Sequence, residues 1–390
     1  MQKVFIIGGL GHIGLCLAAV ISDYYEVFLF DSNDKARYKF NIEKKAAFFE
    51  PGIDDLLQKN TKKIKIVTNL RDVKKCDYVV IAIGTYIDEY FNPVLDHIFS
   101  LFTKLSTILT NQTIIFRSTM YPGMTKKIEK LFTNNIKIAF CPERIQSGNM
   151  IKELKTLPQI ISANTEEALQ KASDFFAPLQ IKQRLLRDTT AGELAKLMTN
   201  AYRYIEFAMA NHFLEMSLDA GCDFYEVFDA IIDEYPRLKN LSKPGYTGGS
   251  CLRKDSLQLA AWYSGATFSL AHNASIINEG LPLFIFRQMR KKIENLSEKT
   301  IGLLGMAFKA DCDDIRDSLS FRMKKILENE VKEVLCTDPY VVSKQFVELD
   351  YLIEKSNIII LMTPHSQYKD IVTTKLVIDI WNFFGKGVGL

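Results

Sequence analysis

The sequence lacks the cysteine and histidine spacings that hold metals or build disulfide frameworks. Its seven cysteines are an odd number scattered over 390 residues, without a Cys-x-x-Cys, and its five histidines include no His-x-x-x-His. Scattered, unpaired cysteines are typical of proteins in a reducing compartment. We therefore expect no metal centre, no structural disulfides and a cytoplasmic location.

An excess of charge of one sign is also missing. The 49 Lys and Arg residues against 46 Asp and Glu residues give a net charge of +3, and acids and bases are interspersed. This balance argues against a nucleic acid or an anionic membrane as partner. The uncharged run 4–21 holds four glycines, which favours a strand, a turn and a helix over a membrane span, and no other run is long enough to cross a bilayer.

The remaining pattern predicts an α/β protein of more than one domain. Continuous apolar runs separated by helical segments are typical of parallel strands buried on both faces. We expect two doubly wound Rossmann-like domains, residues 1–188 and 298–390, joined by a central helical domain, residues 189–297. The predicted strands are 3–8, 26–30, 77–84, 113–118, 137–140 and 159–163, then 301–305, 333–337, 357–363 and 376–380. In the long helix after residue 189, the expected core face is Leu194, Leu197, Met198, Ala201, Ile205 and Ala208.

A dinucleotide fingerprint opens the chain. Gly9, Gly11 and Gly14 form a G-x-G-x-x-G directly after the first strand, where we expect Gly9 to allow the tight turn and Gly11 to admit a pyrophosphate. The second strand ends in Asp31, an acid placed to bond ribose hydroxyls and to favour NAD over NADP. Arg37 nearby leaves NADP open, and a glycine turn without a ligand is the plainer alternative.

The segment 244–255 contains the cysteine with the clearest chemical context. Two adjacent glycines, expected to admit a ligand, precede Cys251 just before a predicted helix, and Arg253 and Lys254 follow it. Positive charge and a helix N-terminus favour the thiolate, which is the nucleophilic form of cysteine. Asp255 follows four residues later and would face the same way within a helix. For most of the other cysteines we expect the role of a small buried apolar residue.

A polar stripe runs along the long central helix. Lys196, Asn200 and Arg203 are spaced to share one helix face. A solvated face is the simplest interpretation of such a stripe, yet neighbours such as Tyr202 and Met209 are apolar for an open surface. The pattern alone leaves both a solvated and a functional face open.

Together these motifs resemble the nucleotide-sugar 6-dehydrogenases, the UDP-glucose and UDP-N-acetylhexosamine dehydrogenase family. The resemblance extends over residues 1–382, in the order that the family shows. The motifs that carry it are GGLGHIG at 8–14, EPG at 50–52, STMYPG at 118–123, CPERIQSGN at 141–149, GELAKLMTNAYR at 192–203, PGYTGGSC with KD at 244–255, LGMAFKADCDDIRDS at 304–318 and DPY at 338–340.

The resemblance implies a two-step oxidation of the C6 hydroxyl of a UDP-sugar to a uronic acid with two NAD⁺, a reaction used in polysaccharide biosynthesis. It implies Cys251 as nucleophile, Lys196 and Asn200 as oxyanion donors, Asp255 with Thr119 in proton transfer, and Glu143 in thioester hydrolysis. The implied NAD site is Gly9, Gly11, Ile13, Gly14, Asp31, Arg37, Thr85, Thr119, Lys254 and Arg316. The implied substrate contacts are Glu143, Arg144, Ile145, Lys196, Asn200, Tyr246, Gly248, Phe308 and Lys309. The helix 190–221 would form the core of a homodimer.

The sequence departs from the family at two places. Ile83-Gly84-Thr85-Tyr86 stands where the family often has Val-Pro-Thr-Pro, so only Thr85 is carried over there. Trp381-Asn382 stands where relatives have an arginine that contacts the substrate.

The segments that distinguish the sugars point in two directions. Pro142-Glu143-Arg144 resembles the N-acetylhexosamine branch, whereas Gly-Gly-Ser-Cys followed by Lys254-Asp255 resembles the glucose branch. We give the first more weight, so a UDP-N-acetylhexosamine (GlcNAc or ManNAc) leads and UDP-glucose is the nearest alternative. A two-domain hydroxyacid dehydrogenase would leave the segment after residue 298 unexplained. A silent NAD-binding scaffold would leave Cys251 unexplained.

Overall fold

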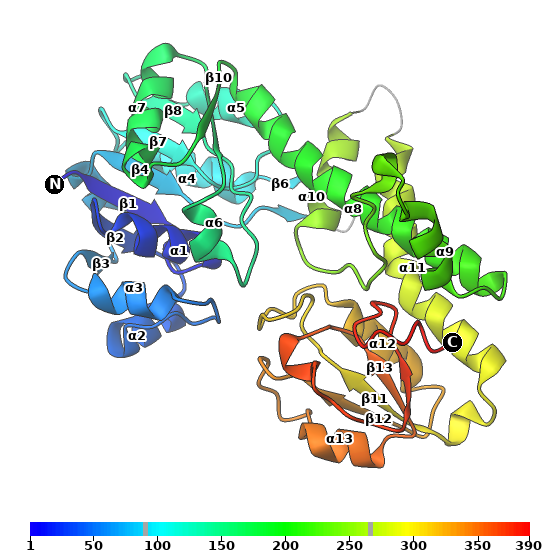
Figure 1. The fold of residues 1–390 in the computed structure, drawn as a ribbon. Coiled ribbons are helices and arrows are strands. Elements are labelled where there is room, and N and C mark those ends of the chain that lie inside the picture. Colours follow the sequence, from blue (N-terminus) through cyan, green and yellow to red (C-terminus); the bar gives the residue numbers. More distant parts are fainter. Residues whose placement is uncertain (89–92, 264–267) are drawn as a thin grey trace. The chain divides into compact units, whose positions relative to one another are not determined.

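The computed structural model describes residues 1–88, 93–263 and 268–390. The chain forms two compact units, Met1–Thr199 and Asn200–Leu390, each with its own β-sheet (Figure 1). The predicted α/β architecture, with two sheets of mainly parallel strands and a central helical region, is confirmed. Residues 264–267, within the stretch expected to be helical, lie outside the described residues.

The first unit is built on an eight-stranded sheet. In spatial order its strands are β10 (Gln183–Leu186), β9 (Gln159–Ala163), β8 (Lys137–Phe140), β7 (Thr113–Phe116), β4 (Tyr78–Ile81), β1 (Lys3–Ile7), β2 (Glu26–Phe30) and β3 (Ile64–Val67). All neighbours are parallel except β8 and β9, which are antiparallel, contrary to the all-parallel sheet expected from the sequence. The segment 141–158 returns at the carboxyl end of β8, so β9 starts there and runs back. A small hairpin of β5 (Tyr86–Ile87) and β6 (Pro93–Val94) lies apart from this sheet.

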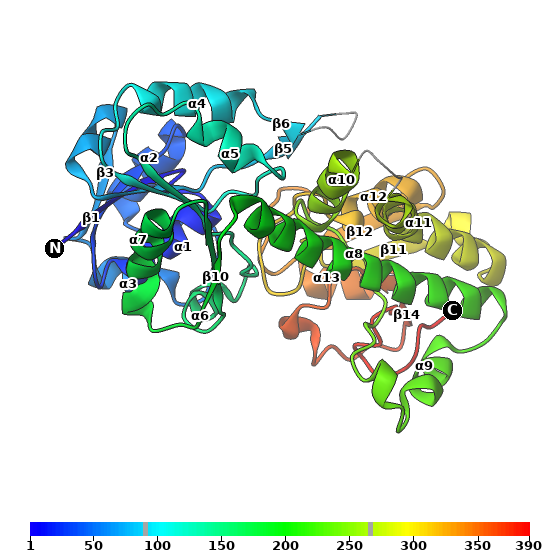
Figure 2. The same ribbon diagram turned by 90° about the horizontal axis from the view of Figure 1, so that it is seen from above.

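Helices cover both faces of this sheet, as a parallel sheet requires. One face packs against α1 (His12–Ile21), α2 (Asp34–Glu43), α3 (Ile53–Lys59), α6 (Met150–Leu154) and α7 (Glu166–Phe176). The other face packs against α4 (Asp96–Ser106) and α5 (Met124–Glu129). Figure 2 shows α4 and α5 on the side of the strands opposite to α1 and α7.

The second unit contains a four-stranded, all-parallel sheet. Its order is β12 (Glu333–Thr337), β11 (Thr300–Leu304), β13 (Ile358–Leu361) and β14 (Leu376–Ile378). One face packs against α12 (Leu319–Leu327) and α11 (Ser269–Lys292), and the other against α13 (Leu349–Lys355). The remaining helices are α8 (Thr189–Asp219), α9 (Phe224–Ile232) and α10 (Leu252–Trp262).

The long helix α8 has polar residues on its buried face and apolar residues on its exposed face. Its buried positions include Glu193, Lys196, Leu197, Asn200, Ala201, Tyr204, Ala208 and Asn211. Its exposed positions include Met198, Tyr202, Met209, Phe213 and Met216. The prediction that Met198 lies in the core is therefore wrong, because 52% of its surface is exposed. The stripe of Lys196 and Asn200 is not a solvated face.

Across the described ranges, every helix is too short or too polar to cross a lipid bilayer.

Candidate active site

The glycine turn after β1 is shaped by the chain itself. Gly8 has a positive φ of +79°, and the N–H groups of Gly8 and Gly9 donate to the carbonyl of Phe30 at 2.9 and 3.1 Å. The positive φ of the tight turn is therefore at Gly8, to which we had assigned no role, and not at Gly9 as expected. A Cβ on Gly9 would lie 3.0 Å from the side chain of Leu29, and one on Gly14 would lie 2.2 Å from the carbonyl oxygen of Gly8. These two glycines let α1 and β2 approach the turn.

Gly11 and Asp31 fit a dinucleotide. Among the described residues, a Cβ on Gly11 would meet one atom, the carbonyl oxygen of Gly8 at 3.5 Å, so none of them requires glycine there. Gly11 is the N-cap of α1 and makes no side-chain cap, and a helix start of this kind is a common binding site for phosphate oxygens. The Asp31 carboxylate accepts one N–H on each oxygen, from Leu10 at 3.1 Å and Asn33 at 2.9 Å. Each oxygen keeps room for a further donor, such as a ribose hydroxyl.

Other residues predicted at the NAD site lie around this turn. Ile13 is half-buried in the first turn of α1, and Thr85 is half-buried after β4. Arg37 donates to the carbonyl of Asp31 and pairs with Asp34, so its guanidinium is held by the protein's own acceptors.

The loop that carries Thr119 is anchored by a buried glutamate that sequence reasoning missed. Thr119 is half-buried in the loop after β7. The Glu193 carboxylate of α8 accepts the N–H of Gly123 at 2.5 Å, and the N–H and hydroxyl of Thr125 at 2.8 and 2.6 Å. Burial raises the pKa of Glu193, and these donors oppose the increase. Its position three residues before Lys196, on the same helix face, was the available signal.

Glu143 forms an ion pair with Arg117, which sequence reasoning also missed. Arg117 directly follows β7, its side chain is fully buried, and its Nη2 pairs with Oε2 of Glu143. Its Nη1 donates to Oε1 of Gln159 at 2.6 Å, and the guanidinium lies 5.4 Å from the ring centroid of Phe176. Burial lowers the pKa of Arg117 to about 10. An arginine at the end of an apolar strand was the available signal.

The second oxygen of Glu143 is held by the backbone. Its Oε1 accepts the N–H groups of Arg144 and Ile145, at 2.6 and 2.9 Å. The guanidinium of Arg144, a predicted substrate contact, donates to the carbonyl of Pro158. The carboxylate of Glu143 is thus held in one orientation from both sides.

In the second unit, Cys251, Asn200, Lys254 and Asp255 come together. Asn200 Nδ2 donates to Oδ2 of Asp255 at 2.6 Å, and Nζ of Lys254 lies 2.8 Å from Oδ1 of the same carboxylate. The Asp255 N–H donates to the Cys251 carbonyl at 2.9 Å, at the start of α10. Asp255 is 1% exposed, whereas Cys251 is exposed at the N-cap of α10. Lys196 lies one turn before Asn200 on α8 and is buried.

Exposure separates the other thiols from Cys251. Five cysteines are buried, and burial raises the pKa of each of them. For Cys312 the value is about 11, and for Cys76 it is about 12. Cys222 is exposed like Cys251, but it follows a single glycine and lies one residue before the N-cap of α9, whereas Cys251 is itself the N-cap of α10.

Glycine is required at both positions of the pair that precedes Cys251 for a different reason from the one expected. A Cβ on Gly248 would lie 2.6 Å from the carbonyl oxygen of Asp317, and one on Gly249 would lie 2.6 Å from the ring of Phe308. Gly249 has a φ of +94° and donates its N–H to Asp317 at 3.2 Å. The space at this glycine pair is filled by residues of the C-terminal sheet domain, not left open for a ligand.

Trp381 packs on the same loop. A Cβ on Gly245 would lie 2.0 Å from the Trp381 ring, and the buried ring of Tyr246 meets Trp381 edge-on at 6.4 Å. The indole N–H donates to the carbonyl of Met362 at 3.2 Å. Asn211 of α8 also holds Gly245, with its Oδ1 accepting the Gly245 N–H at 2.8 Å. Trp381 therefore supports the loop at the position where an arginine was expected.

The last predicted residues lie after β11. Phe308 and Lys309 are half-buried, and Phe308 donates its N–H to the carbonyl of Asp314 at 2.9 Å. Arg316 is exposed, and its guanidinium binds both carboxylate oxygens of Asp314, with Nη2 at 2.6 Å from Oδ2.

Comparison with known proteins accounts for nearly the whole chain. Three models of the UDP-glucose/GDP-mannose dehydrogenase family match it in order: the NAD-binding domain over residues 2–180, the central domain over 190–280 and the UDP-binding domain over 302–386. The UDP-N-acetyl-D-mannosamine dehydrogenase of Pyrococcus horikoshii is 30% identical over 380 residues, covering 93% of this chain and 90% of the relative.

Solved structures give the same result for the fold. The UDP-D-ManNAc dehydrogenase structure from Pyrococcus horikoshii has a TM-score of 0.87 at 28% identity, over 97% of this chain and 95% of that one. A UDP-glucose dehydrogenase from Pyrobaculum islandicum also reaches 0.87, at 21% identity over 97% and 94% of the two chains, and shows the fold alone. The chain belongs to the UDP-glucose/GDP-mannose dehydrogenase family and is an NAD-dependent nucleotide-sugar dehydrogenase.

Proposed function

We propose that this enzyme oxidises the C6 hydroxyl of a UDP-N-acetylhexosamine to a carboxylate, with Cys251 as nucleophile. The observation that carries the proposal is the exposed Cys251 at the start of α10, next to the Asn200–Asp255–Lys254 cluster, in which Asn200 and Asp255 are buried. In this proposal residues 1–188 bind NAD, residues 189–297 carry the nucleophile and residues 298–390 bind the UDP-sugar.

The first oxidation needs a proton acceptor for the C6 hydroxyl. When bound, NAD⁺ accepts the hydride that leaves C6 in each of the two oxidations. Asp255 receives the hydroxyl proton. The family resemblance assigns Thr119 to the same proton transfer. Asn200 and Lys254 orient the Asp255 carboxylate, because each occupies a different oxygen of it.

The second oxidation needs the aldehyde to be held. The Cys251 sulfur adds to the aldehyde carbon and forms a thiohemiacetal, whose oxygen is stabilised by the donors of Lys196 and Asn200. Loss of the second hydride gives a thioester. Water then adds to its carbonyl carbon, the acid leaves and the thiol is restored. The family resemblance assigns Glu143 to this hydrolysis.

The proposal also assigns the identity of the sugar. The Pro142-Glu143-Arg144 segment and the relatives named UDP-N-acetyl-D-mannosamine dehydrogenase favour UDP-N-acetylmannosamine. The Gly-Gly-Ser-Cys segment with Lys254 favours UDP-glucose as the second candidate. NADH formation with UDP-glucose, UDP-N-acetylglucosamine and UDP-N-acetylmannosamine will distinguish them. The highest kcat/KM with UDP-glucose would overturn the assignment.

The covalent mechanism has its own test. We expect two NADH per sugar oxidised, and release of aldehyde with one NADH would refute the double oxidation. Cys251→Ala should abolish acid formation while NAD still binds. Cys222→Ala is the matched control, because Cys222 is the other exposed cysteine, and it should keep full activity.

We also propose that a second copy of the chain covers the exposed apolar face of α8. Met198, Tyr202, Met209 and Met216 are 49–64% exposed on one side of a single helix. Apolar side chains gathered on one exposed face are typical of an interaction surface. Isologous dimers bury such self-complementary patches. Met209→Lys should shift the protein to monomer in sedimentation velocity. Val342→Lys, at a fully exposed position elsewhere, should not. An unchanged mass for Met209→Lys would contradict this interface.

A further inference from the structure

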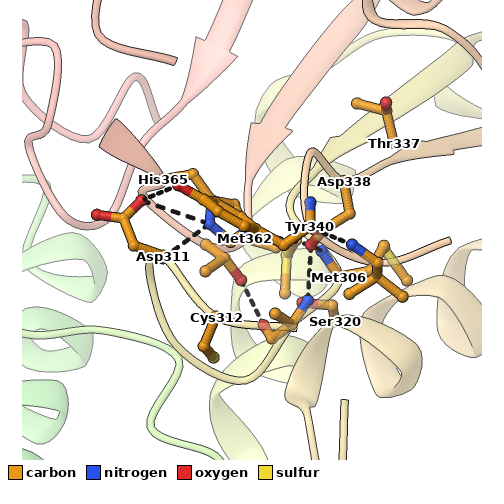
Figure 3. A network of polar contacts seen from close by, with 12 residues as sticks. Met306, Asp311, Cys312, Ser320, Thr337, Asp338, Tyr340, Met362 and His365 are labelled. Carbon is orange, nitrogen blue, oxygen red and sulfur yellow. Dashed lines mark hydrogen bonds and ion pairs between the residues drawn. The ribbon is translucent and has the colours of Figure 1, made fainter. Parts of the chain in front are cut away.

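The loop 305–312, which follows β11, is clamped to the ends of the two neighbouring strands. Asp338, directly after β12, accepts the N–H groups of Met306 and Ala307 on Oδ2, at 2.6 and 2.9 Å (Figure 3). The hydroxyl of Thr363, after β13, donates to the Ala307 carbonyl at 2.6 Å. The beginning of the loop is therefore held from both sides.

His365 holds the end of the same loop. Its side chain is fully buried, and its Nδ1 lies 2.9 Å from the backbone N of Asp311. A backbone N–H can only donate, so Nδ1 is unprotonated and the ring proton is on Nε2. Nε2 lies 3.1 Å from Oδ2 of Asp338 and donates a hydrogen bond to it (Figure 3). One neutral imidazole thus links Asp311 at the end of the loop to the carboxylate that holds its beginning.

The Asp338 carboxylate has no capacity left for a ligand. Its Oδ2 accepts two N–H groups and His365, and its Oδ1 accepts the N–H groups of Tyr340 and Val341, at 2.8 and 3.0 Å. A carboxylate offers about four lone-pair sites, so these five donors saturate it. Asp31, in the same position after the second strand of the other sheet, accepts only two backbone N–H groups. Asp31 can therefore still accept a hydrogen bond from a ligand, whereas the lone pairs of Asp338 are all used by its own chain.

Between the two anchors, the loop carries Phe308 to the cysteine segment. The Phe308 ring occupies the place that a Cβ on Gly249 would take, at 2.6 Å. Gly249 lies two residues before Cys251, with a backbone conformation that suits glycine alone. A shift of the loop would move Phe308 and release the backbone that leads into Cys251.

We propose that Asp338 and His365 are positioning residues, which set Phe308 against Gly249 and so fix the backbone from which Cys251 reacts. The catalytic consequence rests on the proposed role of Cys251. The positional consequence does not, because the reaction of Cys251 with a small electrophile needs no sugar. The two can therefore fail separately.

The test measures Cys251 directly, in a Cys222→Ser background so that one exposed thiol remains. We expect His365→Ala to lower the rate of Cys251 alkylation by iodoacetamide at least fivefold and kcat at least tenfold. NAD affinity should stay within twofold, because the glycine turn of the first unit is untouched. Alkylation and kcat within twofold of the parent would overturn the proposal.

A milder pair of variants keeps the proposal testable if His365→Ala does not fold. Thr363→Val removes only the hydroxyl that holds Ala307, whereas Thr363→Ser keeps it. We expect Thr363→Val to slow alkylation at least twofold and Thr363→Ser to restore the parent rate. Equal rates for both would refute the clamp. Ser356→Ala, a buried position before β13 at the far end of the same strand, is the control and should change neither alkylation nor kcat. If no UDP-sugar is oxidised by the parent enzyme, the proposed function fails and the alkylation rates still decide this inference.

Discussion

The buried Arg117–Glu143 pair gives the sharpest stability prediction. Arg117→Met removes the charge that faces Glu143 while keeping much of the aliphatic volume beside Phe176. The arginine side chain is fully buried and the glutamate side chain is 10% exposed, so an unpaired carboxylate would remain in a largely dry site. Breaking such a pair costs about 3–5 kcal/mol. For a unit of this size that corresponds to a melting temperature lower by roughly 6–20 °C.

The assay has to report on the first unit. Both tryptophans, Trp262 and Trp381, lie in the second unit, so intrinsic tryptophan fluorescence would miss the change. Hydrogen exchange of the β7 and β8 peptides, together with calorimetry, measures it directly. The double variant Arg117→Met/Glu143→Gln should regain at least half of the lost stability, because both charges are then absent. Arg184→Met, at an exposed position on β10, should stay within about 0.5 kcal/mol of the parent. A double variant no more stable than Arg117→Met would refute the reasoning.

Three further predictions follow from the same structure. Gly14→Ala puts a Cβ 2.2 Å from the Gly8 carbonyl and should weaken NAD binding at least tenfold in calorimetry, whereas Gly280→Ala, in an open helical position, should leave NAD binding unchanged. Burial opposes ionisation of Asp338, but His365 and the backbone donors outweigh it and lower its pKa, so the carboxylate stabilises the fold above pH about 4. The stability difference between the parent and Asp338→Asn in urea should therefore be constant near neutrality and shrink as the pH falls below 4; a difference that grows would contradict it. Two thiols should react with a disulfide reagent in the native protein and seven after unfolding, and a third fast thiol would contradict the burial described.

Strands with a continuous apolar run were predictable from the sequence, and the two edge strands of the large sheet were not. Each strand predicted from a continuous apolar run is present, because such runs have few other places in a folded chain. The hairpin strands β5 and β6 were not predicted, nor were β3 and β10, which are the two edges of the large sheet. These two edge strands contain Lys65 and Arg184, whose charges face solvent and interrupt the apolar pattern. The reversed direction of β9 depends on where the connecting segment returns, which no local pattern records.

The candidate site was predictable where its residues are close in sequence. The glycine turn and the Cys251 segment are short motifs, so their members could be found by spacing alone. Arg117 with Glu143, and Asp338 with His365, are pairs of residues far apart in the chain. Neither composition nor spacing reveals that two such charges or polar groups are buried together. The structural reasons for Gly248 and Gly249 were missed for the same cause, since their neighbours Asp317 and Phe308 are far away in the sequence.

The two faces of α8 place a constraint on how this gene can change. Lys196 and Asn200 lie on the buried face of the helix, and Met198 and Met209 lie on the exposed one. Substitutions on the exposed face leave the buried contacts in place, so that face is free to drift with whatever covers it. Inserting or deleting one residue rotates everything beyond it by about 100°, which exchanges the two faces. We therefore expect homologous sequences to vary more on the exposed face of α8 than on its buried face, while the length of the helix between Lys196 and Met216 stays constant.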